Sequence, residues 1–85
     1  STLFPYTTLF RSEEEEKLWR YVKAADKISA YIKCIEERKS GNTDFIEAEK
    51  TIEKTIRDMH IQEVDYFMEE FIPAYMKTLD ELGKL

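Results

Sequence analysis

The sequence has little of several residue types on which common sites and folds depend. Its 85 residues include one cysteine, one histidine, two glycines and two prolines. Cys34 alone cannot form an intramolecular disulfide, which agrees with a reducing compartment, and we expect a cytoplasmic protein. His60 alone cannot provide a cluster of imidazole ligands. Two isolated glycines leave no glycine-rich loop that could hold a phosphate group.

Long apolar runs are also absent. No stretch approaches the ~18 to 20 apolar residues that are needed to cross a bilayer, so the sequence predicts no membrane span. The formal net charge is −5, and the chain after Ser12 carries −6 because the first twelve residues contribute only Arg11. Since an acidic surface repels phosphate backbones, we expect no nucleic acid polymer as a partner.

The first twelve residues, STLFPYTTLFRS, differ sharply in composition from the EEEE run that follows them. They match, without a mismatch, the translation of one frame of a common short-read sequencing adapter. We therefore interpret residues 1–12 as an adapter-derived, irregular extension, and we expect the gene to continue upstream of Glu13. Residues 13–85 have a size at which a single core barely outweighs the entropy of the chain.

Apolar residues recur at steps of three and four through the rest of the chain, which is typical of helices. The pattern predicts an all-α fold with three helices, roughly 13–39, 43–59 and 61–82. In the first helix, the apolar stripe consists of Leu18, Val22, Ala25, Ser29, Ile32 and Ile35, and is widened by Tyr21, Ile28 and Tyr31.

The predicted helix ends carry recognisable signals. Ser12 is placed to cap the first helix, and Gly41 can adopt the left-handed conformation that ends it. Asn42 or Thr43 is expected to cap the second helix. Pro73 removes a backbone donor and crowds the preceding turn, so it predicts a kink or a break in the third helix. Gly83 is expected to end that helix.

Asp26 is the candidate of greatest chemical interest. It lies at the edge of the apolar stripe of the first helix, where a carboxylate is costly unless it is paired or binds a cation. From spacing alone, a boundary aspartate that reaches water or Lys23 is the more common explanation. The residues themselves leave both interpretations open.

The other reactive groups are better explained as structural, and we identify no catalytic residue in this sequence. His60 lies at the junction of the second and third helices, where an imidazole commonly caps a helix or is solvated. Cys34 has no base within a helical turn and suits a small buried position. The EEEE run is expected to form a solvated first turn. Four aromatic residues are expected to form core or subunit contacts: Tyr66, Phe67, Phe71 and Tyr75.

Three segments carry a resemblance to a known family. They are AADKISAYIKCIEE (24–37), GNTDFIEA (41–48) and QEVDYFMEEFIPAY (62–75). In order and spacing they resemble the C-terminal part of bacterial 5'-deoxynucleotidases of the HD phosphohydrolase superfamily. The likeness runs from about Glu14 to Glu81 and covers about the last third of such an enzyme. It implies a three-helix C-terminal portion of an HD-domain fold.

The resemblance also implies a function. Members of this family are all-α enzymes that hydrolyse deoxyribonucleoside 5'-monophosphates to the nucleoside and phosphate with a divalent metal ion, typically as homodimers. In KAADKISAY, Asp26 corresponds to the family's second aspartate ligand of the metal. A hard oxygen ligand beside imidazoles suits a divalent ion that polarises phosphoryl oxygens.

The chain also departs from the family pattern. The family's His and His-Asp ligands lie upstream of the segments that this chain matches, and His60 corresponds to no ligand position. We therefore expect the isolated chain to be inactive, with an incomplete metal site. Lys27 stands where a small apolar residue is expected, but on a helix it points roughly 100° away from Asp26.

Two alternatives remain open at this stage. One is a small acidic helical interaction module, in which the aromatic residues bind a partner and Asp26 is ordinary surface. The other is an HD phosphohydrolase that acts on a different phosphoester. An in-frame His and a later His-Asp pair upstream of Glu13 would favour an enzyme, whereas a start codon just before Glu13 would favour the interaction module.

Overall fold

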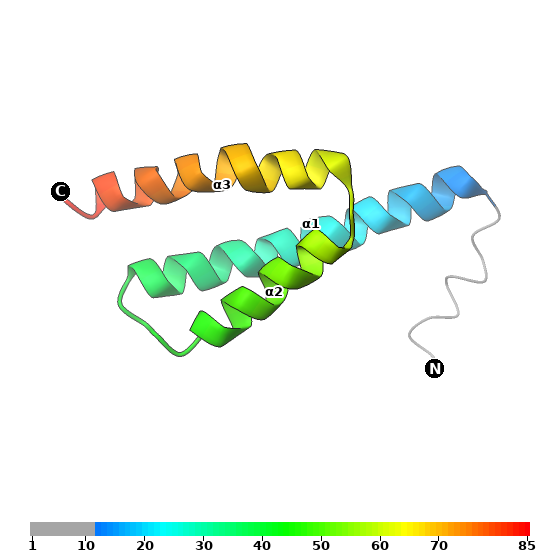
Figure 1. Cartoon of the computed structure of the whole chain (residues 1–85). Coiled ribbons are helices and arrows are strands. Elements are labelled where there is room, and N and C mark those ends of the chain that lie inside the picture. The colour runs from blue at the N-terminus through cyan, green and yellow to red at the C-terminus, as the bar shows by residue number, and fades with distance from the viewer. Residues whose placement is uncertain (1–11) are drawn as a thin grey trace.

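The structure, a computed structural model, describes residues 12–85 and contains three helices over that range. They are α1 (Glu13–Lys39), α2 (Ile46–Asp58) and α3 (Gln62–Leu82). Figure 1 shows α2 and α3 lying along α1, whose N-terminal part extends past both of them. No strand occurs between residues 12 and 85, so the predicted all-α class is confirmed. The predicted adapter-derived extension, residues 1–12, lies outside the described residues except for Ser12.

Both ends of α1 form as their sequence signals predict. The Ser12 hydroxyl accepts a hydrogen bond from the Glu15 backbone N–H at 3.1 Å, and the acidic first turn lies at the positive end of the helix dipole. At the other end, the Asn42 N–H donates to the Glu37 carbonyl at 2.9 Å and the Gly41 N–H to the Arg38 carbonyl at 3.1 Å. This pair of hydrogen bonds at a helix end requires a residue in the left-handed conformation, and Gly41 adopts it with a φ of 97°.

The start of α2 differs from the prediction. Neither Asn42 nor Thr43 caps it: the helix begins at Ile46, preceded by Phe45, and no side chain bonds to its first turn. Asn42 is engaged in the turn instead, because its side chain donates to Glu37 at 2.9 Å and accepts the Asp44 N–H at 3.0 Å. Because the Asn42 side chain is already bonded within this turn, it is not available to cap α2, which begins at Ile46.

Pro73 does not break α3. The helix continues from Gln62 through Pro73 to Leu82, and Figure 1 shows it as one ribbon. Proline costs a helix one hydrogen bond and crowds the preceding turn, but Pro73 is exposed, so water can reach the backbone around it. Of the two predicted outcomes, the break near residue 73 is therefore wrong and the kink stays a prediction, while α3 ends at the predicted glycine, Gly83.

The core is a single apolar cluster at the meeting of the three helices. Ile35 of α1 and Ile56 of α2 are completely buried. The other buried members are Ala24, Tyr31, Ile61, Val64, Met68 and Ile72. Because α2 contributes only one fully buried side chain, its attachment to the other helices depends heavily on Ile56.

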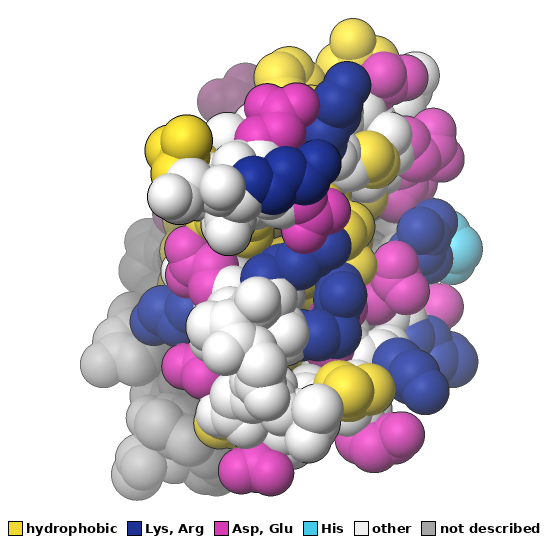
Figure 2. Space-filling view, turned by 90° about the vertical axis from the view of Figure 1, so that its left-hand side faces the viewer, with side chains coloured by type: hydrophobic (Ala, Val, Ile, Leu, Met, Phe, Trp, Pro, Cys, Tyr) yellow, Lys and Arg dark blue, Asp and Glu magenta, His cyan; other side chains and the backbone are white. Residues whose placement is uncertain are grey.

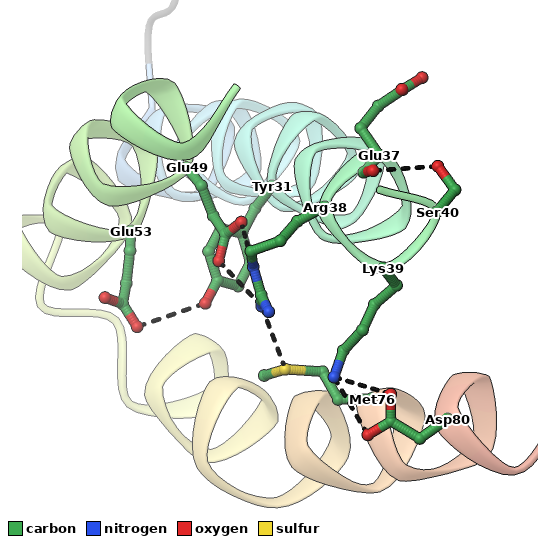
Figure 3. Close-up of polar contacts among 9 residues, drawn as sticks. All are labelled: Tyr31, Glu37, Arg38, Lys39, Ser40, Glu49, Glu53, Met76 and Asp80. Atoms are coloured by element: carbon green, nitrogen blue, oxygen red, sulfur yellow. Dashed lines mark hydrogen bonds and ion pairs between the residues drawn. The ribbon is translucent and has the colours of Figure 1, made fainter. Parts of the chain in front are cut away.

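Polar contacts tie the three helices together at the C-terminal end of α1. Arg38 forms two hydrogen bonds to the Glu49 carboxylate of α2, at 3.0 and 3.2 Å, and a third to the sulfur of Met76 in α3 at 3.7 Å. Lys39 lies 2.8 Å from the Asp80 carboxylate of α3. Figure 3 shows these side chains converging from the three helices. Because two nitrogens of Arg38 bond the two oxygens of Glu49, this contact fixes the relative orientation of the two side chains in addition to pairing their charges.

Tyr31 provides a buried titratable group in the same region. Its hydroxyl donates to the Glu53 carboxylate at 3.3 Å, as Figure 3 shows. Burial, followed by the negative charge of Glu53, raises the pKa of Tyr31 to about 12. The folded protein therefore keeps this phenol neutral at a pH where an unfolded chain, with a tyrosine pKa of about 10, ionises it.

Alkaline pH should consequently destabilise the fold through Tyr31. The contribution of the neutral phenol is fully present below about pH 10 and is lost as the pH rises towards 12, at a cost on the order of 2 kcal/mol. We expect Tyr31→Phe to flatten the fall in unfolding free energy over that interval, measured by denaturant titration at successive pH values. Tyr66→Phe, which removes an exposed phenol, is the control. An unchanged pH dependence in Tyr31→Phe would contradict the prediction.

The apolar stripe predicted for α1 divides into two faces. The side of α1 that meets α2 and α3 carries Ala24, Tyr31 and Ile35, flanked by the half-buried Tyr21 and Ile28. Of the other predicted members, Ile32 is partly buried against the core, whereas Leu18, Val22, Ala25 and Ser29 are exposed. Their prediction as part of one stripe is corrected here, because helical periodicity identifies apolar residues but not which of two neighbouring faces is covered.

The surface carries mixed charge. Figure 2 shows acidic and basic side chains interleaved over the end of the molecule that holds the α1–α2 turn, so neither sign forms a broad patch on that face. Among the helices of residues 12–85, none combines the length and apolarity required to cross a membrane.

Candidate functional site

Asp26 is exposed on α1, on the side turned away from the core. It follows Val22 by four residues, so the two side chains are neighbours on the helix surface. Within residues 12–85 its carboxylate makes neither a hydrogen bond nor an ion pair, and the predicted alternative of pairing with Lys23 is not realised. The carboxylate is therefore available to a group from outside the described part of the chain.

The described residues do not by themselves form a metal centre. In the range 12–85, no three His, Cys, Asp or Glu side chains come together in a way that could hold a metal ion. Asp26 supplies one oxygen ligand, and a divalent ion bound by protein needs several. The arrangement thus fits a part of a metal site and not a complete one.

His60 lies elsewhere, at the junction of α2 and α3. It has a positive φ of 53°, and its N–H donates to the Arg57 carbonyl at 3.1 Å, so it closes the C-terminal turn of α2. A left-handed conformation is uncommon for residues other than glycine, although histidine adopts it more often than most. The position is structural, as the sequence predicted, and gives no contact to Asp26.

A polar groove that the sequence did not reveal runs between the start of α1 and the α2–α3 junction. His60 contributes to its lining together with Tyr21, Arg20 and Glu63. The Tyr21 hydroxyl donates to Glu63 at 2.7 Å, and the Arg20 guanidinium donates to the Met59 carbonyl at 3.0 Å. The Tyr21–Glu63 bond raises the pKa of the phenol and lowers the pKa of the carboxyl.

These contacts fasten α1 to the rest of the bundle. Tyr21 and Glu63 are 42 residues apart in the chain, and no local pattern could have paired them. Because the Tyr21 hydroxyl and the Glu63 carboxylate satisfy each other, this pair has a structural role in the groove.

The other predicted positions are resolved as follows. Cys34 is buried and unpaired, which confirms its expected place as a small apolar residue. The aromatic residues of α3 differ among themselves: Phe67 packs against the core, whereas Tyr66 and Phe71 are 60% and 55% exposed. The exposed pair meets edge to face with ring centroids 6.1 Å apart. Phe67 thus agrees with the expected core contact, whereas for Tyr66 and Phe71 the expected subunit contact stays a prediction.

Comparison with known proteins decides the family. The sequence model of the family described as 5'-deoxynucleotidase YfbR-like matches residues 4–75, which include Asp26 and most of the three helices. The chain belongs to this family. Its membership confirms the relationship that the three segments around Asp26, Asn42 and Tyr66 indicated.

Individual relatives agree with this assignment. The chain is 44% identical over 73 residues to a 5'-deoxynucleotidase of Enterobacter sp. (strain 638), a match that covers 86% of this chain and 35% of the relative. It is 45% identical over 74 residues to a 5'-deoxynucleotidase of Yersinia pestis (strain Pestoides F), covering 87% and 36%. The chain therefore spans about a third of the length of these YfbR-like relatives. No solved structure matches it significantly.

Proposed function

We propose that this chain forms the C-terminal helices of a metal-dependent 5'-deoxynucleotidase, which hydrolyses deoxyribonucleoside 5'-monophosphates to the nucleoside and phosphate. Family membership over residues 4–75 carries the proposal, and the names of the relatives supply the substrate class. The working enzyme is a cytoplasmic homodimer in this proposal, and the single unpaired Cys34 is compatible with a reducing compartment.

Asp26 is the residue of this chain that we assign to the metal site. It is exposed and free of partners within residues 12–85, and its hard carboxylate oxygen suits a divalent cation. Such an ion, when bound, stabilises charge on the phosphoryl oxygens and lowers the pKa of a coordinated water. The role of Asp26 is to hold one coordination position from the rigid surface of α1.

The remaining ligands belong to the part of the enzyme that this chain does not span. Because no three metal-ligating side chains come together within residues 12–85, we propose that the chain alone has no activity. Cys34 is buried and His60 closes a helix turn, so neither is assigned to catalysis.

The test compares the chain with a complete enzyme. The chimera is defined as the Enterobacter relative in which residues 13–85 of this chain replace the matching segment. We expect no release of inorganic phosphate from a deoxynucleoside 5'-monophosphate by the isolated chain, and metal-dependent release by the chimera. The parent relative is the positive control, and the same relative without the matching segment is the negative control.

Two results would contradict the proposal. One is metal-dependent hydrolysis by the purified chain alone. The other is a chimera that is folded by circular dichroism and yet inactive towards every deoxynucleoside 5'-monophosphate, while the parent relative remains active. Activity of the chimera towards a different phosphoester would identify another phosphohydrolase of the same superfamily.

A further inference from the structure

The middle of α1 is basic although the chain as a whole is acidic. The chain has a net charge of −5. The stretch from residue 17 to residue 33 nevertheless contains Asp26 as its only acid and five basic residues: Lys17, Arg20, Lys23, Lys27 and Lys33. Such a local concentration of positive charge attracts anions where neighbouring carboxylates do not neutralise it.

Three of these cations form a ridge along one flank of α1. We define the basic ridge as Arg20, Lys23 and Lys27, which follow one another at steps of three and four and therefore lie on one side of the helix. All three are exposed. Arg20 and Lys23 also border the same small depression beside Met59, so their side chains open onto one surface.

The described residues do not neutralise the ridge. Lys23 and Lys27 make neither a hydrogen bond nor an ion pair within residues 12–85. Arg20 donates to the Met59 carbonyl at 3.0 Å, which is a neutral acceptor. On α2, by contrast, each cation pairs with a carboxylate: Lys50, Lys54 and Arg57. The ridge is therefore available to an anion from outside the described part of the chain.

The basic ridge lies beside Asp26. Lys23 precedes Asp26 by three residues, so the two side chains are neighbours on the helix surface. Lys27 lies one turn beyond Lys23 and extends the positive charge past Asp26. The resemblance gives a small apolar residue at position 27, so Lys27 is a cation that the family pattern does not include. A divalent ion at Asp26 and the ammonium of Lys23 would present two positive groups to one ligand.

A phosphate group is the anion that suits this arrangement. A lysine ammonium is a compact charge with three donors, and it binds phosphate oxygens well. A carboxylate ligand cancels part of the charge of a divalent ion, so a phosphate dianion gains from a further cation beside the metal. We propose that Lys23 binds the phosphate group of the substrate at Asp26, and that Lys27 attracts it electrostatically. This inference rests on the proposed function and names the cations that hold its substrate.

The experiment measures the binding of inorganic phosphate, the product, to the metal-loaded chimera by titration calorimetry. Lys23→Gln should weaken binding by about tenfold, because it removes a charge-assisted hydrogen bond. Lys23→Arg keeps the charge and should stay within about threefold of the unsubstituted chimera. Lys27→Gln should weaken binding by about threefold at low salt, and 0.5 M sodium chloride should abolish this smaller loss by screening.

Lys33→Gln is the matched control. Lys33 is exposed and unpaired within residues 12–85, and it lies on the same helix about 10 Å along the axis from Asp26. Its replacement should change phosphate binding by less than about twofold. Equal losses for Lys23→Gln and Lys33→Gln would assign the effect to net charge and overturn the proposal. Unchanged binding in Lys23→Gln would also overturn it, as would a folded, metal-loaded chimera that binds no phosphate.

Thermal stability distinguishes a structural role for Lys23. In our proposal Lys23→Gln shifts the unfolding midpoint of the chimera by less than about 3 °C and leaves its metal content, measured by elemental analysis, unchanged. A lysine that pairs with an acid elsewhere in the enzyme gives a different result. A midpoint lowered by about 5 °C or more, with phosphate binding unchanged, would identify such a structural ion pair and overturn the proposal.

The activity of the chimera is scored separately. With a deoxynucleoside 5'-monophosphate, Lys23→Gln should raise KM by about tenfold and change kcat by less than about threefold, because the lysine holds the phosphate both before and during the reaction. A chimera that binds phosphate through Lys23 but hydrolyses no deoxynucleoside 5'-monophosphate would support the phosphate site and refute the proposed function. Hydrolysis that is indifferent to Lys23 would support the function and refute the phosphate site.

Discussion

Asp26→Ala in the chimera is expected to lower the rate of phosphate release by about 1,000-fold or more. Loss of a metal ligand removes stabilisation of several kcal/mol from the transition state, and each 1.4 kcal/mol corresponds to about tenfold in rate. Asp26 is exposed, and its side chain makes neither a hydrogen bond nor an ion pair within residues 12–85. The substitution should therefore leave the fold intact, and the loss should appear in turnover and in bound metal, measured by elemental analysis.

Asp44→Ala is the matched control for this result. Asp44 is also an exposed aspartate inside the range that matches the family, but it lies in the turn before α2. Its replacement should preserve activity and metal content within about twofold. If Asp26→Ala retained near-normal turnover and metal, Asp26 would not be part of the site, and the assignment of the metal ligand would be wrong.

Ile56→Ala is expected to unfold most of the isolated chain at 25 °C. Ile56 is completely buried and is the one buried side chain of α2. Truncation of a buried isoleucine to alanine costs about 2 to 5 kcal/mol, whereas a core of this size rarely supplies more than about 3 to 5 kcal/mol in total. Thermal and urea unfolding, followed by circular dichroism, would show the loss of the cooperative transition.

Ile46→Ala tests whether burial is the cause. Ile46 is in the first turn of the same helix and is only partly buried, so the same chemical change should cost much less, about 1 kcal/mol. Alanine has a higher helix propensity than isoleucine, so propensity cannot account for a loss at either position. Equal destabilisation by the two substitutions would therefore contradict the dependence of α2 on the burial of Ile56.

The sequence predicted the elements of the fold better than their arrangement. Helical periodicity and the local signals of Ser12 and Gly41 are properties of neighbouring residues, so α1 begins and ends where they indicate. Asn42 was misjudged because it can close its own turn as well as cap a helix. Leu18 and Val22 were assigned to a single stripe because periodicity does not show where a second helix will lie.

The candidate site, like the fold, could be predicted from the sequence only in part. Asp26 could be identified from the sequence because its position beside an apolar stripe is local, and because the surrounding segment resembles a family. The contact of Tyr21 with Glu63 could not, since it joins residues that only the fold brings together. A complete metal site could not be predicted from residues 12–85, because no three His, Cys, Asp or Glu side chains come together within that range.

The overhanging N-terminal part of α1 has a consequence for assembly. Its first turn is held by the Ser12 cap and by its own acidic residues, so this segment is helical without support from α2 or α3. Asp26 lies further along the same helix, beside the buried Ala24, so in the proposed enzyme its backbone is already ordered and little conformational entropy is left to lose when the metal site forms. If Asp26 is a metal ligand as proposed, the free energy of association can then go into positioning the ligands instead of ordering the helix that bears this one.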